Sequence, residues 1–335
     1  MKYKPIKFPQ DESLHKSIIE WWYFNGNIKS RKNNYAFMHT LFKVDIKRAL
    51  PILERIPEKY LYFTHSIISD INKNKTYVDI EPLVFVSKGS FLNKKLSVRY
   101  NPPFLKKKNY LIEETGKYKY KIKSNFLDLL AKSSKKPLLE GGKGFLNLRK
   151  NSTYYYSLTN LKTSGFIFIN NKKIKVSGKS WMDHQWADPK SYDSKWVWLS
   201  IQLYNDVEIV CFDYKGRKNM DLIDKKGKAR NIKEISMVPC SYWKSKISRV
   251  KYPVAWIIKT KNIEIRAEPL LRNQEIVSWP MNYWEGPLKI TGKINGKKVS
   301  GKGFLELFGY HPKSLIGEYE SAFKKKIMEI LTCSK

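Results

Sequence analysis

The stretch Lys173-Ile-Lys-Val-Ser-Gly-Lys-Ser-Trp181 runs directly into Met182-Asp-His-Gln-Trp186. A second stretch, Lys297-Lys-Val-Ser-Gly-Lys-Gly-Phe304, repeats the Val-Ser-Gly-Lys core and continues into Leu305-Glu-Leu-Phe-Gly-Tyr310. Each copy is preceded by a short basic hairpin, with Asn170-Asn171 before the first and Asn295-Gly296 before the second. We interpret them as one β-hairpin that is used twice, late in each half of the chain. The repeat therefore predicts a duplicated β-domain.

The rest of the sequence also favours strands over helices. Several segments are rich in aromatic and β-branched residues, and tight-turn pairs such as Asn25-Gly26 and Lys215-Gly216 separate them. The predicted strands lie at 35–44, 60–68, 196–203, 207–212, 254–260 and 263–267. Together with the repeat, they predict an all-β protein with a boundary at 187–195. The predicted domains are 1–190 and 191–335.

Helical patterns are confined to two segments. Apolar residues recur with a period close to 3.6 between Ser314 and Leu331, which predicts a C-terminal helix. A shorter helix is predicted over residues 126–132. The remaining sequence carries no comparable periodicity, so helices contribute little to the predicted fold.

The chain is strongly basic, with a net charge of +34 from 64 Lys and Arg against 30 Asp and Glu. Only ten of the 64 are Arg, the residue that bidentate recognition of phosphates and bases prefers. The lysines are scattered through turns such as 106–108 and 172–173. We therefore expect no nucleic-acid partner and interpret most of the charge as compositional bias. Docking of a basic face on an anionic membrane stays as the alternative.

Cysteine usage and hydropathy indicate a cellular compartment. The three cysteines show no paired spacing, which fits a reducing environment. The first fifteen residues lack the apolar core of a signal peptide, and no stretch approaches the ~18 apolar residues of a membrane span. We expect a soluble cytoplasmic protein, with peripheral membrane contact as the alternative, that is a monomer or a weak dimer.

Four stretches carry a resemblance to a known family. They are Glu20-Trp-Trp-Tyr-Phe-Asn-Gly-Asn27, Tyr154-Tyr-Tyr-Ser-Leu-Thr-Asn160, Gly178-Lys-Ser-Trp-Met-Asp-His-Gln-Trp186, and Tyr283-Trp-Glu-Gly-Pro287 continuing to Gly303–Tyr310. With these motifs the chain resembles the two-domain lipocalin-like proteins that include carotenoid 1,2-hydratase (hydroxyneurosporene synthase), secreted hydrolase-like proteins and lipocalin-like Diels–Alderases. The resemblance implies two lipocalin-like antiparallel β-barrels packed together. Barrels of about eight strands hold one small, mostly apolar ligand.

The sequence also departs from the family pattern at the central motif. Gln185 stands where the family often has Glu, and Ala187 stands where it often has Gly. Because Gln185 cannot act as an acid, the departure puts more weight on Asp183.

The residue types of the central motif suit acid-initiated chemistry on an alkene. Such chemistry requires a carboxylic acid that stays protonated near neutral pH, and burial against indoles favours that form. It also requires aromatic walls for a cation, each worth ~2 kcal/mol or more. In an extended strand, Trp181 and Asp183 face one way and His184 the other. We therefore predict Asp183 and Trp181 as the catalytic pair and His184 as an orienting group. A purely structural Asp183 is the alternative.

Further candidates lie in the aromatic and acidic motifs of both halves. The predicted substrate-binding residues are Glu20, Trp22, Trp186, Trp284, Glu285 and Tyr310. For Trp22, packing in a barrel core is the favoured alternative, and Tyr310 could equally close a barrel. The chain lacks the glycine-rich nucleotide motifs and a nucleophile elbow, so we predict no cofactor. We also predict no metal. A site made by His39, His65 and His184 is the minor alternative.

Two functions remain open from the sequence. The first is an enzyme that acts on a hydrophobic isoprenoid- or polyketide-like small molecule. Its chemistry would be that of a hydratase, a lyase similar to carotenoid 1,2-hydratase, or that of an isomerase or cyclase. The second is a carrier that binds a lipid or pigment without catalysis, as many lipocalin barrels do. In both cases the expected partner is a hydrophobic small-molecule ligand.

Overall fold

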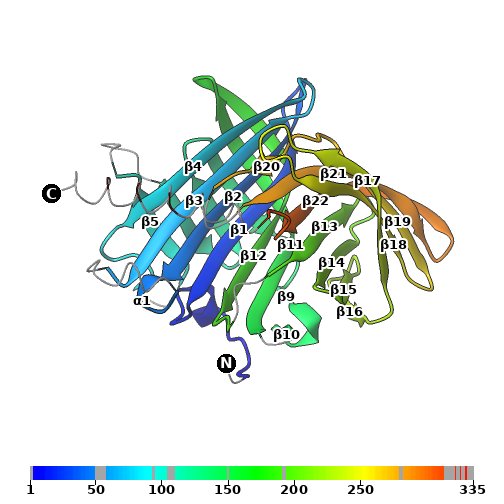
Figure 1. Cartoon of the computed structure of the whole chain (residues 1–335), viewed down its shortest axis with the longest axis horizontal. Helices are drawn as coiled ribbons and strands as arrows, with labels where there is room; N and C mark the ends of the chain where they lie inside the picture. The colour runs from blue at the N-terminus through cyan, green and yellow to red at the C-terminus, as the bar shows by residue number, and fades with distance from the viewer. Residues whose placement is uncertain are drawn as a thin grey trace. The chain divides into compact units, whose positions relative to one another are not determined.

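The computed structural model describes residues 3–49, 58–92, 95–103, 110–148, 151–190, 194–278 and 282–312, together with Ser321, Lys325 and Glu329. These three single residues are helical, and the rest of the predicted C-terminal helix lies outside the described residues. Figure 1 shows that the described chain is almost entirely β, which confirms the predicted fold class. No helix within these ranges is long and apolar enough to cross a lipid bilayer.

The chain divides into two compact units. The described residues of the first unit lie within Met1–Ile68, Tyr77–Ser191 and Ile327–Lys335, and those of the second lie within Ser69–Thr76 and Tyr192–Lys326. Each unit has its own antiparallel sheet and its own hydrophobic core. The short segment Ser69–Thr76 is the turn region between two strands of the first sheet, yet it belongs to the second unit.

The first sheet closes into a barrel because its strand β8 pairs with β11. Around the ring the order is β11, β12, β1, β2, β3, β4, β5, β6, β7, β8. The ring strands are β1 (Ile19–Lys29), β2 (Asn34–Asp45), β3 (Tyr60–Asp70), β4 (Lys75–Val86), β5 (Ser97–Asn101), β6 (Tyr110–Gly116), β7 (Lys119–Lys123), β8 (Leu127–Ser133), β11 (Asn151–Ile169) and β12 (Lys172–Ala187). The smaller elements are η1 (Gln10–Glu12), α1 (Ile46–Ala49), β9 (Leu138–Leu139), η4 (Glu140–Gly142) and β10 (Phe145–Leu148).

The interior of this barrel is filled by large side chains from alternate strand positions. Trp22, Tyr156 and Trp186 contribute to this core, together with many aliphatic residues of the ring strands. Trp22 lies across from His184 between β1 and β12, and Tyr156 lies across from His184 between β11 and β12. Because cross-strand partners share one face of a sheet, His184 also faces the interior.

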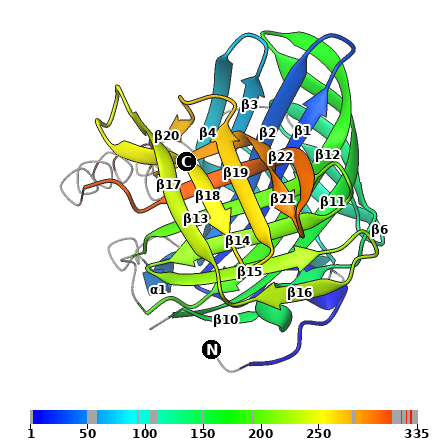
Figure 2. The ribbon, with the colours of Figure 1, turned by 90° about the vertical axis from the view of Figure 1, so that its right-hand side faces the viewer.

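The second sheet follows the order β16, β15, β14, β13, β22, β21, β19, β18, β17, and β20 pairs with β21. Its strands are β13 (Trp196–Leu203), β14 (Glu208–Tyr214), β15 (Arg217–Ile223), β16 (Ala229–Ile232), β17 (Ser236–Lys244), β18 (Lys251–Lys259), β19 (Ile263–Pro269), β20 (Glu275–Ile276), β21 (Tyr283–Ile294) and β22 (Lys297–Phe308). The strands β13 to β16 follow one another in Figure 2. No pairing between β16 and β17 is present in the described residues, so this sheet is a half-barrel there.

The two copies of the Val-Ser-Gly-Lys core occupy the same position in both sheets. Each lies in the second strand of a long antiparallel hairpin, β11–β12 in the first unit and β21–β22 in the second. Gly178 pairs with Thr163, and Gly301 pairs with Ile290. The duplicated hairpin seen in the sequence is therefore present in the structure.

Two local predictions are wrong. Asn25-Gly26, predicted as a tight turn, lies within strand β1 and pairs with both neighbouring strands. The segment predicted as a short helix at 126–132 belongs to β8, whose burial alternates along Leu127–Ser133. Its Leu-Asp-Leu-Leu-Ala sequence is compatible with a helix in isolation. Pairing with β7 on one side and β11 on the other favours the strand, since it closes the barrel.

Candidate active site

The central motif lies on β12 and sends neighbouring side chains to opposite faces of the barrel wall. Met182 and Trp186 pack in the barrel core with the interior-facing His184. Trp181 and Asp183 occupy the other positions and are also buried, with 0% and 4% exposure. The alternation predicted from the sequence is confirmed. Asp183 and His184 consequently belong to two separate polar clusters.

Asp183 accepts hydrogen bonds from side chains on β11 and β12. The Tyr155 hydroxyl lies 2.7 Å from Oδ2, and the Trp181 indole Nε1 lies 2.6 Å from Oδ1. Ser157, directly across from Asp183 in the β11–β12 register, places its Oγ 2.5 Å from Oδ1. A buried carboxyl is tolerated only with such partners. Burial and the adjacent Asp183 raise the pKa of Tyr155, so its hydroxyl keeps its proton and donates.

A second buried acid completes this outer cluster. Glu140, the first residue of η4, is fully buried and has its Oε1 2.7 Å from the same Ser157 Oγ. The Ser157 hydroxyl thus lies between two carboxyl groups. We call Glu140, Tyr155, Ser157, Trp181 and Asp183 the outer cluster.

The interior cluster is centred on Glu20 of β1, which is fully buried. Its Oε1 lies 2.7 Å from Nδ1 of His15 and 2.9 Å from Nε2 of His184. On the other side of the carboxyl group, Lys43 Nζ lies 3.2 Å from Oε2. Lys43 also donates to the backbone carbonyls of His15 and Ser17, at 2.8 Å each. Two imidazoles and one ammonium group therefore surround one carboxylate.

The interior cluster fixes the charges of its members. Burial alone would raise the pKa of Glu20, but hydrogen bonds from His15 and His184 outweigh it and lower the pKa to about 2. Burial lowers the pKa of His184 to about 4 in spite of Glu20. Neutral His184 therefore donates from Nε2 to Glu20, and its Nδ1 can accept from the Tyr156 hydroxyl at 3.3 Å. For His15, hydrogen bonds with Asp11 and Glu20 outweigh burial and raise the pKa.

Aromatic rings pack on both histidines of this cluster. His15 stacks on Trp186 with ring centroids 3.8 Å apart, and His184 stacks on Trp22 at 4.9 Å. His15, Glu20 and His184 each offer a ligand atom, and these atoms lie within 4.8 Å of one another, so the set could coordinate a cation. The buried ammonium of Lys43 already provides a positive charge beside Glu20, which disfavours a metal there.

Glu12 of η1 is a further buried acid of the first unit. It is fully buried, and neither carboxyl oxygen makes a hydrogen bond of normal geometry. Burial, followed by the repulsion from Glu114, raises the pKa of Glu12 to about 8. The carboxyl group of Glu12 is therefore protonated at neutral pH.

The candidates of the second half lie in the second unit. The Trp284 indole donates to the Arg272 carbonyl at 2.7 Å within the second core, as a packing residue would. Glu285 lies across from Glu306 in the β21–β22 register, and Trp196 donates its indole N–H to Glu306. Tyr310 packs on Tyr252, and the Lys195 ammonium lies 4.1 Å from its ring centroid.

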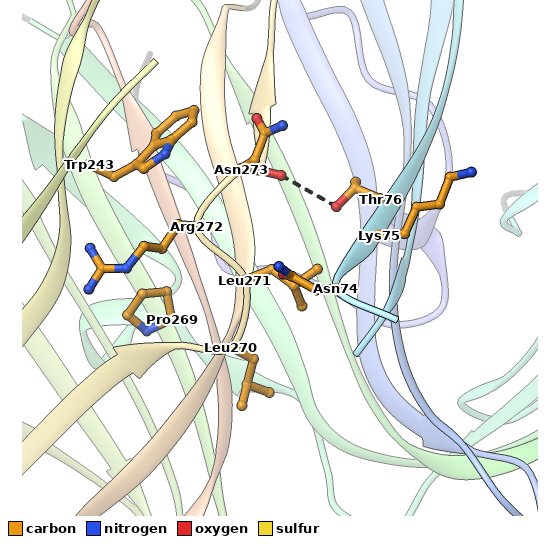
Figure 3. A pocket seen from close by; sticks show the side chains of 9 residues that line it. All are labelled: Asn74, Lys75, Thr76, Trp243, Pro269, Leu270, Leu271, Arg272 and Asn273. Atoms are coloured by element: carbon orange, nitrogen blue, oxygen red, sulfur yellow. Dashed lines mark hydrogen bonds between the residues drawn. The ribbon is translucent and has the colours of Figure 1, made fainter. Parts of the chain in front are cut away.

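The second unit also contains a pocket of about 710 Å³, drawn in Figure 3. Nine residues line it, namely Asn74, Lys75, Thr76, Trp243, Pro269, Leu270, Leu271, Arg272 and Asn273. Thr76 donates to the Asn273 carbonyl at 3.3 Å across one side. The lining holds two cationic side chains but no carboxylate or imidazole, so it offers no acid–base pair.

The structure brings six of the nine predicted site residues together in two clusters. Asp183 and Trp181 share the outer cluster, Glu20, Trp22, His184 and Trp186 share the interior cluster, and the other three candidates lie in the second unit. The minor metal alternative is not supported, because His39 bonds to Ser66 and Tyr100 at 2.6 and 2.7 Å.

Sequence reasoning missed His15, Lys43, Glu140, Tyr155 and Ser157. Tyr155 and Ser157 lie at alternate positions of the Tyr154–Asn160 motif, which places them on one face of an extended strand. The β11–β12 hairpin pairs Ser157 with Asp183, past a bulge between Leu158 and Leu161.

Comparison with known proteins supports the fold over about nine-tenths of the chain. A crystal structure of a protein from Nitrosomonas europaea described as AttH matches with a TM-score of 0.76 and 26% identity, covering 92% of this chain and 98% of that chain. Kievitone hydratase from Nectria haematococca matches with a TM-score of 0.71 and 16% identity, covering 91% of this chain and 93% of that chain. At this identity the second likeness shows the fold alone.

Among curated proteins, the dehydratase asqC of Emericella nidulans is 22% identical over 202 residues. The match covers 54% of this chain and 57% of that protein, so it spans little more than half the length of this relative. The AttH-like family matches over residues 1–310, nearly the full length of the chain. The lipocalin-like resemblance is thus supported at this broader level, and the chain belongs to the AttH-like family.

Proposed function

We propose that this protein is a hydratase or dehydratase that acts on a hydrophobic isoprenoid- or polyketide-like small molecule. In this proposal Asp183 is the catalytic acid, and the Trp181 indole lies beside the reacting carbon atoms. Hydration adds a proton to one alkene carbon and water to the other, and dehydration reverses the same steps. Carotenoid 1,2-hydratase-like chemistry is the specific form that we propose to test first.

One observation carries the proposal. Two buried carboxyl groups, Asp183 and Glu140, lie on either side of the Ser157 hydroxyl and next to an indole. Acid-initiated chemistry needs a proton held away from bulk water and an electron-rich wall that stabilises a developing cation. This group of side chains offers both within one cluster.

The relatives support the same reaction class. One is named a dehydratase and another a kievitone hydratase, and these names describe addition and removal of water. We assign the interior cluster a positioning role, because its hydrogen bonds join β1, β2 and β12 behind Asp183. His184 would then orient the strand rather than contact the substrate, and Glu20, Trp22 and Trp186 would support it.

The proposal can be tested with a panel of polyene, terpenoid and polyketide alkenes and the corresponding alcohols. The protein is incubated with each compound in ¹⁸O-water, and mass spectrometry detects gain or loss of one water molecule. We expect Asp183→Asn to lower turnover by about 10²–10⁴-fold, the usual contribution of a general acid. Asp128→Asn, an acid-to-amide change on β8 of the same barrel, is the matched control.

Two results would count against this function. Unchanged turnover in a folded Asp183→Asn variant would remove Asp183 from the mechanism. An unaltered hydrophobic ligand that co-purifies with the protein, with no product from any compound, would favour the carrier instead.

A further inference from the structure

We propose that Glu140 holds the proton that Asp183 delivers, and that the Ser157 hydroxyl relays it between the two carboxyl groups. The catalytic meaning of this inference rests on the proposed function. Its structural part, the presence of one proton on the acid pair, rests on hydrogen-bond geometry and burial alone.

The number of hydrogens at Ser157 requires that proton. Its Oγ lies 2.7 Å from Glu140 Oε1 and 2.5 Å from Asp183 Oδ1, and both are hydrogen-bond distances. A serine hydroxyl has one hydrogen to donate, whereas an ionised carboxylate can only accept. If both acids were ionised, the single Ser157 hydrogen could be donated to only one of them. The other short contact would then join two oxygen atoms with no hydrogen between them. One of the two acids must therefore carry a proton that points at Ser157.

The partners of Asp183 place this proton on Glu140. Trp181 Nε1 is a donor only, and it is directed at Asp183 Oδ1. The Tyr155 hydroxyl, which keeps its proton in this buried environment, donates to Oδ2. With Ser157 as the third donor, Asp183 is surrounded by groups that suit a carboxylate. Glu140 is then the donor to Ser157, and Ser157 is the donor to Asp183.

Burial makes this arrangement stable. Glu140 and Ser157 are fully buried and Asp183 is 4% exposed, so bulk water cannot replace the shared hydrogen bonds. Two adjacent ionised carboxylates in such a place would repel each other, and sharing one proton removes the repulsion.

The transfer conserves protons and charge. The Ser157 hydrogen moves to Asp183 as the Glu140 hydrogen moves to Ser157, which leaves Glu140 ionised and Asp183 protonated. Asp183 then gives its proton to an alkene carbon, and the C=C bond becomes a carbocation. Water attacks the cation, and the proton that the bound water loses returns through Asp183 and Ser157 to Glu140. The net reaction adds one water molecule, and dehydration follows the reverse order.

Infrared spectroscopy of protein with ¹³C-labelled glutamate tests the proton without any substrate. A protonated glutamic acid has a C=O band that ionisation removes. At pH 7 we expect the Glu140→Gln spectrum to have one such band fewer than the wild-type spectrum. The glutamine amide can still donate a hydrogen bond to Ser157. Glu12→Gln is the matched control, because Glu12 is a different buried acid that is protonated at this pH. It should remove another band and leave that of Glu140 in place.

A second variant keeps the test valid if Glu140→Gln fails to fold. Asp183→Asn removes the neighbouring negative charge, so the Glu140 band should shift its titration to lower pH. A Glu140→Gln spectrum that retains every band of the wild-type protein would overturn the inference. So would an Asp183→Asn protein in which the Glu140 band titrates as before.

Activity then separates this inference from the proposed function. With a compound that turns over, Glu140→Gln and Ser157→Ala should each lower kcat by about 10-fold or more and change the pH dependence of kcat, as loss of a proton relay does. If no compound turns over but the infrared band is lost as expected, the proposed function fails and the shared proton stands. Normal kcat and an unchanged pH profile in both variants would exclude the relay.

Discussion

At the scale of single residues, the buried ion pair of Lys43 and Glu20 constrains the stability of the first unit. Lys43 is fully buried, and its ammonium makes four contacts that include Glu20 Oε2 at 3.2 Å. Removing one partner of a buried ion pair leaves an uncompensated charge. We expect Lys43→Met to destabilise the protein by on the order of 3 kcal/mol, measured by urea unfolding.

The control for this prediction is Lys59→Met. Lys59 is 57% exposed and lies 4.0 Å from Asp45, so its loss should change stability by less than about 0.5 kcal/mol. The double variant Glu20→Gln with Lys43→Met should be less destabilised than the sum of the single changes, since no lone charge remains. Equal effects of Lys43→Met and Lys59→Met would show that the buried pair is not a stability determinant.

At the scale of elements, the repeated hairpin explains why glycine recurs in both Val-Ser-Gly-Lys cores. A Cβ atom on Gly178 would clash with the Asn27 carbonyl of the adjacent strand, and a Cβ atom on Gly301 would clash with that of Gln202. Both neighbours are backbone atoms that cannot rotate away. We expect Gly178→Ala and Gly301→Ala to cost about 1–3 kcal/mol each, read from denaturant midpoints.

Gly116 offers the matched control, because no heavy atom of a residue beyond its chain neighbours lies within 4 Å of the position that an alanine methyl group would take there. Gly116→Ala should be neutral, or stabilising by about 0.4–1 kcal/mol through the unfolded chain. If all three substitutions behaved alike, close strand approach would not be the reason for the repeated glycine.

The elements also show what the sequence could predict. Period-two patterns identified strands such as β2, β3 and β13, and alternation alone assigned Asp183 and His184 to opposite faces. The helix predicted at 126–132 was wrong because cross-strand pairing overrides local propensity. Ser157 was not predicted as the partner of Asp183 because a β-bulge between Leu158 and Leu161 shifts the register of the β11–β12 hairpin, and Glu140 lies in η4, outside that hairpin. The sequence pattern alone does not show where such a bulge lies.

At the scale of the whole molecule, the high net positive charge and the lowered pKa values of two carboxyl groups both make the folded protein less stable in acid. Protonation of the 30 carboxylates would nearly double the net charge of +34. Repulsion between positive charges in the folded protein would then increase. Burial alone would raise the pKa of Glu20 and of Glu275. In the first unit, hydrogen bonds from His15 and His184 outweigh burial and leave the pKa of Glu20 at about 2. In the second unit, hydrogen bonds from His311, Ser245, Ser248 and Tyr252 outweigh burial and leave the pKa of Glu275 at about 2.

A folded pKa below the ordinary value of 4.5 means that these two carboxylates stabilise the protein above pH 4.5 and lose that effect as pH falls toward 2. We expect the thermal midpoint, followed by circular dichroism, to fall steadily below pH 4.5. Salt at about 0.5 M should restore part of the loss by screening repulsion. Glu20→Gln and Glu275→Gln should flatten the decline, whereas Glu268→Gln, at a 41% exposed side chain, should not. A midpoint that stays constant from pH 6 to pH 3 would contradict both contributions, because neither repulsion nor the buried carboxylates would then depend on protonation.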